Sequence, residues 1–124
     1  MAFNDPQSVT IDGTAYSLAR SYTGSAQGRF TTADGARQLE IVPPSQGVTS
    51  TARRHSIARL RSTKISPDPL TAVNTRVGDL ISLNINRPSA GFTDAEIEKE
   101  VVGFFAWLTA GTNANLKKLI AGEN

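Results

Sequence analysis

The period with which apolar residues recur changes once along this 124-residue chain. Up to Pro88, apolar and polar residues largely alternate, as they do in strands of a sheet that has one buried face. From Thr93 onward, apolar residues recur every three or four positions, as they do on the buried side of a helix. Strands first and helices last predict an α+β fold, in which an antiparallel sheet carries its helices on one side.

Turn residues divide the first part of the chain. Asp12-Gly13 lies between two alternating runs and predicts a β-hairpin within residues 1–20, because both turn positions of such a hairpin require positive φ. A second hairpin is expected around Ala33–Gly35, and Pro43 should end its second strand because proline cannot donate to the ladder. A loop is expected at residues 21–28, and either a loop or a continuation of the strand at residues 45–50.

Two longer strands are expected at residues 52–65 and 72–86, and Gly78-Asp79 marks a point where the second could break. A proline-bracketed turn at residues 66–69 joins them. The period of two sorts the first long strand into a cationic face and a smaller, more apolar face. The cationic face carries His55, Ile57, Arg59, Arg61 and Thr63. The other face carries Arg54, Ser56, Ala58, Leu60 and Ser62.

Two helices are expected in residues 93–122. Thr93 and Glu96 have the spacing of a capping box, in which each side chain bonds the other residue's backbone N–H. An apolar stripe follows on Ile97, Val101, Phe104, Phe105 and Leu108. Gly111 should stop this helix, and a shorter helix should then end at Gly122. The stripe is too apolar for a lone surface helix and predicts a partner that covers it.

Charge is unevenly distributed although the net charge is only +2. Residues 41–92 carry a net charge of +5, and no acidic residue occurs in residues 41–67. Such segregation favours a surface that meets a polyanion. The alternative is a set of solvated arginines, or arginines that pair with Glu40 or Asp79 on neighbouring strands.

The sequence offers little for catalysis. There is no cysteine, and His55 is the single histidine, so neither a disulfide framework nor a Cys-His pair is available. His55 is read as a polar strand residue, and the acidic residues of the first helix as a solvated, capped helix end. No catalytic residue, metal site or cofactor is predicted, and an enzyme is the weakest of the functional hypotheses. Neither a signal peptide nor an apolar run long enough to span a bilayer is recognised. No membrane partner is therefore predicted, and the protein is expected either to be made and used in a cytosol or to leave the cell by a route that needs no signal.

The basic strand carries the strongest functional signal. The planar guanidinium group of arginine can donate two parallel hydrogen bonds to one phosphate. Polar side chains on an exposed sheet face can form hydrogen bonds with unstacked bases. Ser82 and Asn84 lie on the polar face of the last strand. Single-stranded or looped RNA is therefore the expected ligand.

These features together resemble the coat proteins of the single-stranded RNA bacteriophages, the leviviruses, over nearly the whole chain. The resemblance rests on the hairpin around Asp12-Gly13, the basic strand at residues 52–60, the alternating strand at residues 79–88 and the capped helix that opens at Thr93. It implies one domain over residues 1–124, with an N-terminal β-hairpin, a five-stranded antiparallel sheet at residues 29–88 and two C-terminal α-helices. It also implies an interlocked homodimer, whose helices pack on the partner's sheet.

The resemblance further implies an icosahedral shell that encloses the viral RNA, assembled in the cytoplasm of a bacterial host and found in the virion. In this family the inner sheet face binds RNA, including a genomic hairpin, and the coat dimer represses translation by binding that hairpin. The RNA-binding residues implied here are Arg53, Ile57, Arg59, Arg61, Ser82 and Asn84. The dimer interface implied is the stripe of Ile97, Val101, Phe104, Phe105 and Leu108. The rival hypothesis is a small dimeric cellular regulator that binds nucleic acid and forms no shell.

Overall fold

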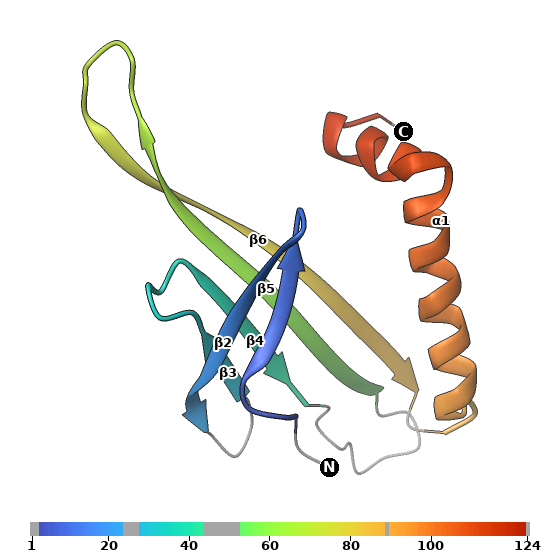
Figure 1. The fold of residues 1–124 in the computed structure, drawn as a ribbon. Helices are drawn as coiled ribbons and strands as arrows, with labels where there is room; N and C mark the ends of the chain where they lie inside the picture. Colours follow the sequence, from blue (N-terminus) through green and yellow to red (C-terminus); the bar gives the residue numbers. More distant parts are fainter. Residues whose placement is uncertain (1–2, 24–27, 44–52, 89, 124) are drawn as a thin grey trace. The chain divides into compact units, whose positions relative to one another are not determined.

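The computed structural model describes residues 3–23, 28–43, 53–88 and 90–123. These residues form six strands and a helix in the order expected for an α+β chain (Figure 1). The elements are β1 (Gln7–Ile11), β2 (Thr14–Thr23), β3 (Gly28–Thr31), β4 (Arg37–Val42), β5 (Arg53–Pro67), β6 (Asn74–Pro88) and α1 (Asp94–Ala121). The loop expected at residues 45–50 lies outside the described residues, as do residues 24–27 of the loop expected at residues 21–28. The rest of that second prediction is wrong, because residues 21–23 belong to β2 and Gly28 belongs to β3.

The six strands lie side by side in chain order. The β2 strand is ten residues long and pairs with two neighbours in turn, with β1 through Thr14–Leu18 and with β3 through Ala19–Thr23. The expectation of a hairpin followed by a separate five-stranded sheet is therefore corrected. The β2 strand belongs both to the hairpin and to the rest of the sheet, so the structure has six strands where seven were expected.

The predicted hairpin turns are confirmed. Asp12 and Gly13 both have positive φ between β1 and β2. In the turn between β3 and β4, the Asp34 carboxylate accepts from the Thr32 hydroxyl at 2.7 Å and from the Ala36 N–H at 3.0 Å. These two hydrogen bonds lower the pKa of Asp34 below its ordinary value. The β4 strand ends at Val42, immediately before Pro43.

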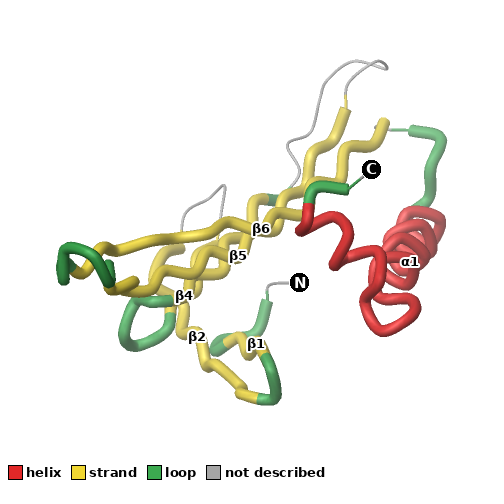
Figure 2. Tube along the Cα trace, turned by 90° about the horizontal axis from the view of Figure 1, so that it is seen from above, coloured by secondary structure: helices red, strands yellow, loops and turns green. Residues whose placement is uncertain are grey.

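The β5 and β6 strands are each 15 residues long and form a hairpin that extends beyond the other strands (Figures 1 and 2). The Asp68 carboxylate holds the connecting turn by accepting from the Leu70 N–H at 2.9 Å and from the Thr71 hydroxyl at 2.9 Å. The break considered at Gly78 is wrong, because β6 runs through it without interruption. A Cβ at Gly78 would lie 3.2 Å from the Thr63 methyl carbon, so a glycine there lets the two strands stay close.

The hairpin of β1 and the first half of β2 folds over one face of the remaining strands, where Tyr16 meets Arg37 of β4. We call this face the apolar face. Leu39 of β4 is the register partner of both Phe30 and Leu60, and all three residues define this face. Leu18 and Phe30 are the fully buried hydrophobic residues among those that the structure describes. The core of the described chain is thus small for its length.

The α1 helix begins as predicted. The Thr93 hydroxyl accepts from the Glu96 N–H at 3.3 Å, and the Glu96 carboxylate accepts from the Thr93 N–H at 2.9 Å. Gly122 caps the other end with φ of 80°.

The prediction of two helices is corrected to one helical element with a kink. The backbone leaves the helical region at Ala110–Asn113, where Gly111, Thr112 and Asn113 have positive φ, and these four residues form a kink between two helical halves of one element. The Asn115 side chain donates to the Trp107 carbonyl at 2.9 Å and so bridges the kink. The glycine signal therefore identified the change of direction but not the continuity of the element.

The chain divides into two compact units, residues 1–87 with the sheet and residues 88–124 with the helix. The single domain over residues 1–124 stays a prediction. The described helix lacks the apolar length that crossing a bilayer requires.

Candidate nucleic-acid interface

The register of the sheet brings charged and aromatic side chains into one row. Residues that lie directly opposite each other in antiparallel strands point to the same face. Tyr22 pairs with Arg29, Arg29 with Glu40, and Glu40 with Arg59, so four neighbouring strands each contribute one side chain. These residues lie on the face opposite to Phe30 and Leu60. We call it the basic face.

The predicted RNA-binding residues of β5 lie on the same face. Alternation along the strand places Arg53, Ile57 and Arg61 with Arg59. Arg61 is exposed and is the register partner of Gln38, whereas Ile57 is half-buried and opposite Val42. His55 is an exposed member of this row.

The β6 strand adds polar side chains to the basic face. The Arg53 Nε donates to the Asn86 Oδ1 at 2.8 Å, which places Asn86 on the side of Arg53. Ser82 and Asn84 follow by alternation, and both are exposed. All six predicted RNA-binding residues therefore lie on one face, although their binding of RNA remains a prediction.

The alternative of internally paired arginines is realised in part. Glu40 Oε2 lies 3.5 Å from Arg59 Nη1, and Glu40 Oε1 lies 3.9 Å from Arg29 Nη2. The Glu40 side chain is 16% exposed, against 35% for Arg59 and 39% for Arg29. One largely covered carboxylate thus serves two more accessible guanidinium groups, which leaves excess positive charge at the surface.

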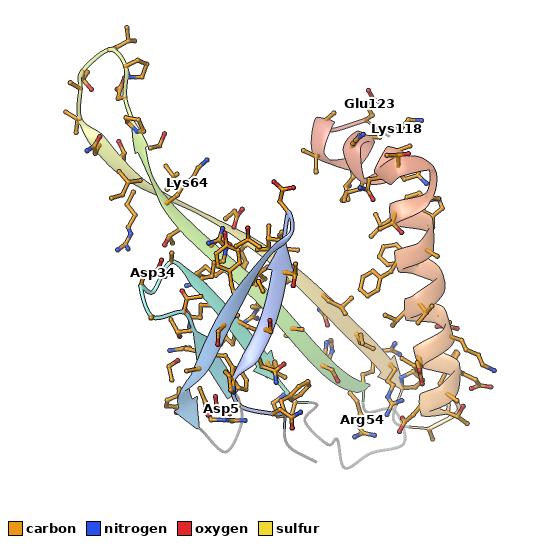
Figure 3. All side chains as sticks on the ribbon, in the orientation of Figure 1. Asp5, Asp34, Arg54, Lys64, Lys118 and Glu123 are labelled. Carbon is orange, nitrogen blue, oxygen red and sulfur yellow. The ribbon has the colours of Figure 1, made fainter. Side chains whose placement is uncertain are left out.

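Cations on the apolar face have a different environment. The Arg20 guanidinium lies 4.7 Å from the centre of the Phe30 ring, and that of Arg37 lies 3.8 Å from the centre of the Tyr16 ring. These cation–π contacts occupy both guanidinium groups within the protein. Alternation also places Arg54 and Lys64 on the side of Leu60, toward opposite ends of β5 (Figure 3). The cations of residues 41–92 are therefore divided between the two faces, and the basic face holds only some of them.

The predicted dimer stripe lies along α1. Ile97, Val101 and Leu108 are half-buried, while Phe104 and Phe105 are 54% and 44% exposed. Phe104 stacks on Trp107 with 6.1 Å between ring centres, and Trp107 is itself 55% exposed. The exposed aromatic cluster thus includes Trp107, which the predicted stripe did not contain, beside Phe104 and Phe105.

Sequence reasoning missed three residues of the basic face. Tyr22 and Arg29 were not considered for RNA binding, and Glu40 was considered only as a partner for an arginine. The signal for Arg29 and Glu40 was their spacing around the second hairpin, which fixes the β3–β4 register. No signal in the sequence identifies the face of Tyr22, because a register shift between β2 and β3 determines it. Within the described ranges, no group of three or more His, Cys, Asp or Glu residues is arranged to hold a metal ion.

Comparisons of the sequence alone find no relative, since no protein-family model and no curated protein matches it. Comparison of the structure does find similar proteins. A chain of the virus-like particle of bacteriophage AVE019 matches with a TM-score of 0.80 and 15% identity, covering 98% of this chain and 97% of that one. A chain of the virus-like particle of Beihai levi-like virus 21 matches with a TM-score of 0.66 and 13% identity, covering 96% and 94%.

An unassembled bacteriophage coat-protein dimer, described as an RNA-binding dimer, matches with a TM-score of 0.54 and 14% identity over 97% of this chain and 95% of that one. These similarities extend over nearly the full length of each chain. The protein therefore has the fold of the coat proteins of levi-like RNA bacteriophages.

Proposed function

We propose that this protein is a viral coat protein, a structural protein and not an enzyme, that dimerises and assembles into an icosahedral shell around an RNA genome. The observation that carries the proposal is the fold shared with a coat protein of virus-like particles over 98% of this chain and 97% of that one.

Two features of the described chain support assembly. Its fully buried hydrophobic residues are few, and large apolar side chains of α1 are exposed, among them Phe104, Phe105 and Trp107. A monomer with such a surface gains stability when a second copy covers it. We therefore propose that the stripe of Ile97, Val101, Phe104, Phe105 and Leu108 lies in the dimer interface.

We propose that the basic face binds RNA through Arg53, Ile57, Arg59, Arg61, Ser82 and Asn84. Arg61 is exposed, and Arg59 faces a single carboxylate that it shares with Arg29. Arg53 is oriented by Asn86 on the neighbouring strand. Guanidinium groups of this kind suit phosphates, and the exposed Ser82 and Asn84 supply donors and acceptors for base edges. The specific ligand proposed is a hairpin of the viral genome, a translational operator at which the bound dimer represses translation.

The test of assembly is expression of the chain alone in bacteria, followed by negative-stain electron microscopy and an absorbance ratio at 260 and 280 nm. Uniform spherical particles with nucleic-acid absorbance are expected. A small dimer without particles would overturn the coat-protein proposal and favour the cellular regulator.

Specificity is tested on the RNA extracted from such particles. Sequencing should reveal enrichment of stem-loops over the remaining transcripts, if one hairpin is preferred. Uniform coverage of host RNA would reduce the proposal to packaging without specific recognition.

A further inference from the structure

We propose that Tyr22 and Arg29 form a subsite for one unpaired nucleotide at the β2 end of the basic face. Tyr22 stacks on the base, and Arg29 binds a neighbouring phosphate. The inference rests on the proposed RNA-binding function and adds two residues, from strands β2 and β3, that neither the sequence nor the fold comparison assigns.

A shift of register places Tyr22 on the basic face. Arg20 pairs with Phe30, yet Tyr22 pairs with Arg29, so one extra residue lies in β2 between them. Strict alternation would give Arg20 and Tyr22 the same face, the apolar one. The extra residue moves Tyr22 to the opposite face, and bulges of this type commonly redirect a side chain beside a functional site.

The bulge is held by a specific contact. The hydroxyl groups of Ser21 and Thr31 lie 2.7 Å apart, and the Ser21 hydroxyl also lies 3.4 Å from the Arg29 carbonyl. Thr31 is on β3, the strand that carries Arg29. Ser21, the extra residue that breaks the alternation, is thus hydrogen-bonded to β3, the strand with which Tyr22 pairs.

The Tyr22 ring is accessible. It is 49% exposed, and β1 pairs with β2 only as far as Leu18, so among the described strands β3 alone pairs with β2 at Tyr22. Exposed aromatic rings on a sheet are the surfaces on which unpaired bases stack, and the stacking tolerates any base.

Arg29 is positioned between the ring and the rest of the basic row. Its guanidinium carbon lies 5.7 Å from the centre of the Tyr22 ring, and its Nη2 lies 3.9 Å from Glu40. Both distances are longer than the matching contacts of Arg37 with Tyr16 and of Arg59 with Glu40. Arg29 therefore keeps hydrogen-bonding capacity for a phosphate next to the stacked base.

The charge of this face favours RNA over a protein partner as the occupant. The row that begins at Tyr22 and Arg29 continues to Arg59, with the exposed Arg61 two residues further along β5. A ring at the end of a row in which the guanidinium groups outnumber the one carboxylate, Glu40, fits a chain that presents bases and phosphates in alternation.

The test is a binding titration of the assembled dimer with a labelled short oligouridine and with a duplex RNA of the same length. Tyr22→Leu should weaken oligouridine binding about tenfold, leave duplex binding unchanged and leave the salt dependence unchanged, because stacking is not ionic. Tyr22→Phe should bind like the parent protein. The matched control is Tyr16→Leu, which removes an arginine-stacked tyrosine from the opposite face.

A second readout uses the unaltered protein, so it does not depend on a variant that folds. Irradiation with oligouridine that carries 5-iodouridine should produce a crosslink at Tyr22, located by mass spectrometry. If the parent protein bound neither RNA, the proposed function itself would fail. If the parent protein bound RNA while Tyr22→Leu bound it equally and the crosslinks lay elsewhere, only the subsite would be overturned. If Tyr22→Leu altered particle assembly but not RNA affinity, Tyr22 would be a contact between subunits, which also overturns the subsite.

Discussion

Glu40 and Arg59 face each other across β4 and β5 as register partners, with 3.5 Å between Glu40 Oε2 and Arg59 Nη1. The carboxylate is the less exposed member of the pair, at 16% against 35%. A phosphate that approaches Arg59 must therefore compete with an acidic group already inside the protein. The basic face thus contains its own counter-ion.

Removal of that counter-ion should strengthen RNA binding. Glu40→Gln keeps the side-chain shape but releases Arg59 and Arg29 for phosphates, so we expect affinity for single-stranded RNA to rise several-fold and the salt dependence to steepen by about one unit. Fluorescence anisotropy at several salt concentrations measures both. Glu98→Gln on α1 is the control, since it makes the same change in net charge outside the sheet. Equal gains in the two variants would mean that only net charge matters.

Loss of single arginines should have the opposite effect. Arg59→Gln and Arg61→Gln should each weaken RNA binding and lower the slope of log affinity against log salt by about one unit, because each removes one phosphate contact. Lys64→Gln removes a cation from the same strand on the apolar side and should leave the slope unchanged. A slope unaffected by all three variants would move RNA to another surface.

The apolar stripe of α1 should be required for the dimer. Val101→Asp places a charge among apolar side chains of the proposed interface and should yield monomers at micromolar concentration, measured by size-exclusion chromatography with light scattering. Val102 is the adjacent residue of the same type, is 61% exposed and lies outside the stripe, so Val102→Asp should remain dimeric. A monomeric Val102→Asp protein with an intact Val101→Asp dimer would place the interface on the other side of the helix.

The capping box of α1 should contribute measurably to stability. Thr93→Ala removes the acceptor for the Glu96 N–H and should lower the free energy of unfolding by about 1 kcal/mol. Urea titration followed by circular dichroism measures the change. Thr109→Ala makes the same substitution within the helix, where alanine has the higher propensity, so it should be neutral or slightly stabilising.

The turn between β3 and β4 should respond to acid through Asp34. The Thr32 hydroxyl and the Ala36 N–H lower the pKa of Asp34, so the ionised form stabilises the folded turn. That contribution is present above the ordinary aspartate pKa, near 4, and is lost as the pH falls through the lower folded-state value. Thr32→Val should raise the pKa of Asp34, as measured by carbon NMR of the carboxyl group. The pKa of Asp68, lowered chiefly by the Leu70 N–H in a different turn, should not move.

Much of the architecture was predictable because its signals are local. Asp12-Gly13 specified a turn through its backbone conformation, Pro43 ended a strand by lacking an N–H, and Thr93 with Glu96 opened a helix by bonding groups three residues apart. The separation of Arg59 and Arg61 from Leu60 followed from alternation within one uninterrupted strand. Each of these inferences needs only neighbouring residues.

The predictions were wrong where the outcome depends on contacts that local sequence patterns do not reveal. The β2 strand pairs with β1 and then with β3, which local alternation does not reveal, and so one strand too many was expected. Gly111 marked a change of direction in α1, but the contact of Asn115 with the Trp107 carbonyl that bridges the kink joins residues eight apart.

The sequence by itself thus determined the order of elements, their turns and caps, and the two faces of the basic strand, since these depend on contacts within a few residues. Only the tertiary structure decided that Glu40 would lie between Arg29 and Arg59, and that the extra residue at Ser21 would turn Tyr22 toward them. Register between strands results from the pairing of whole strands, and a shift of one residue moves a side chain to the other face.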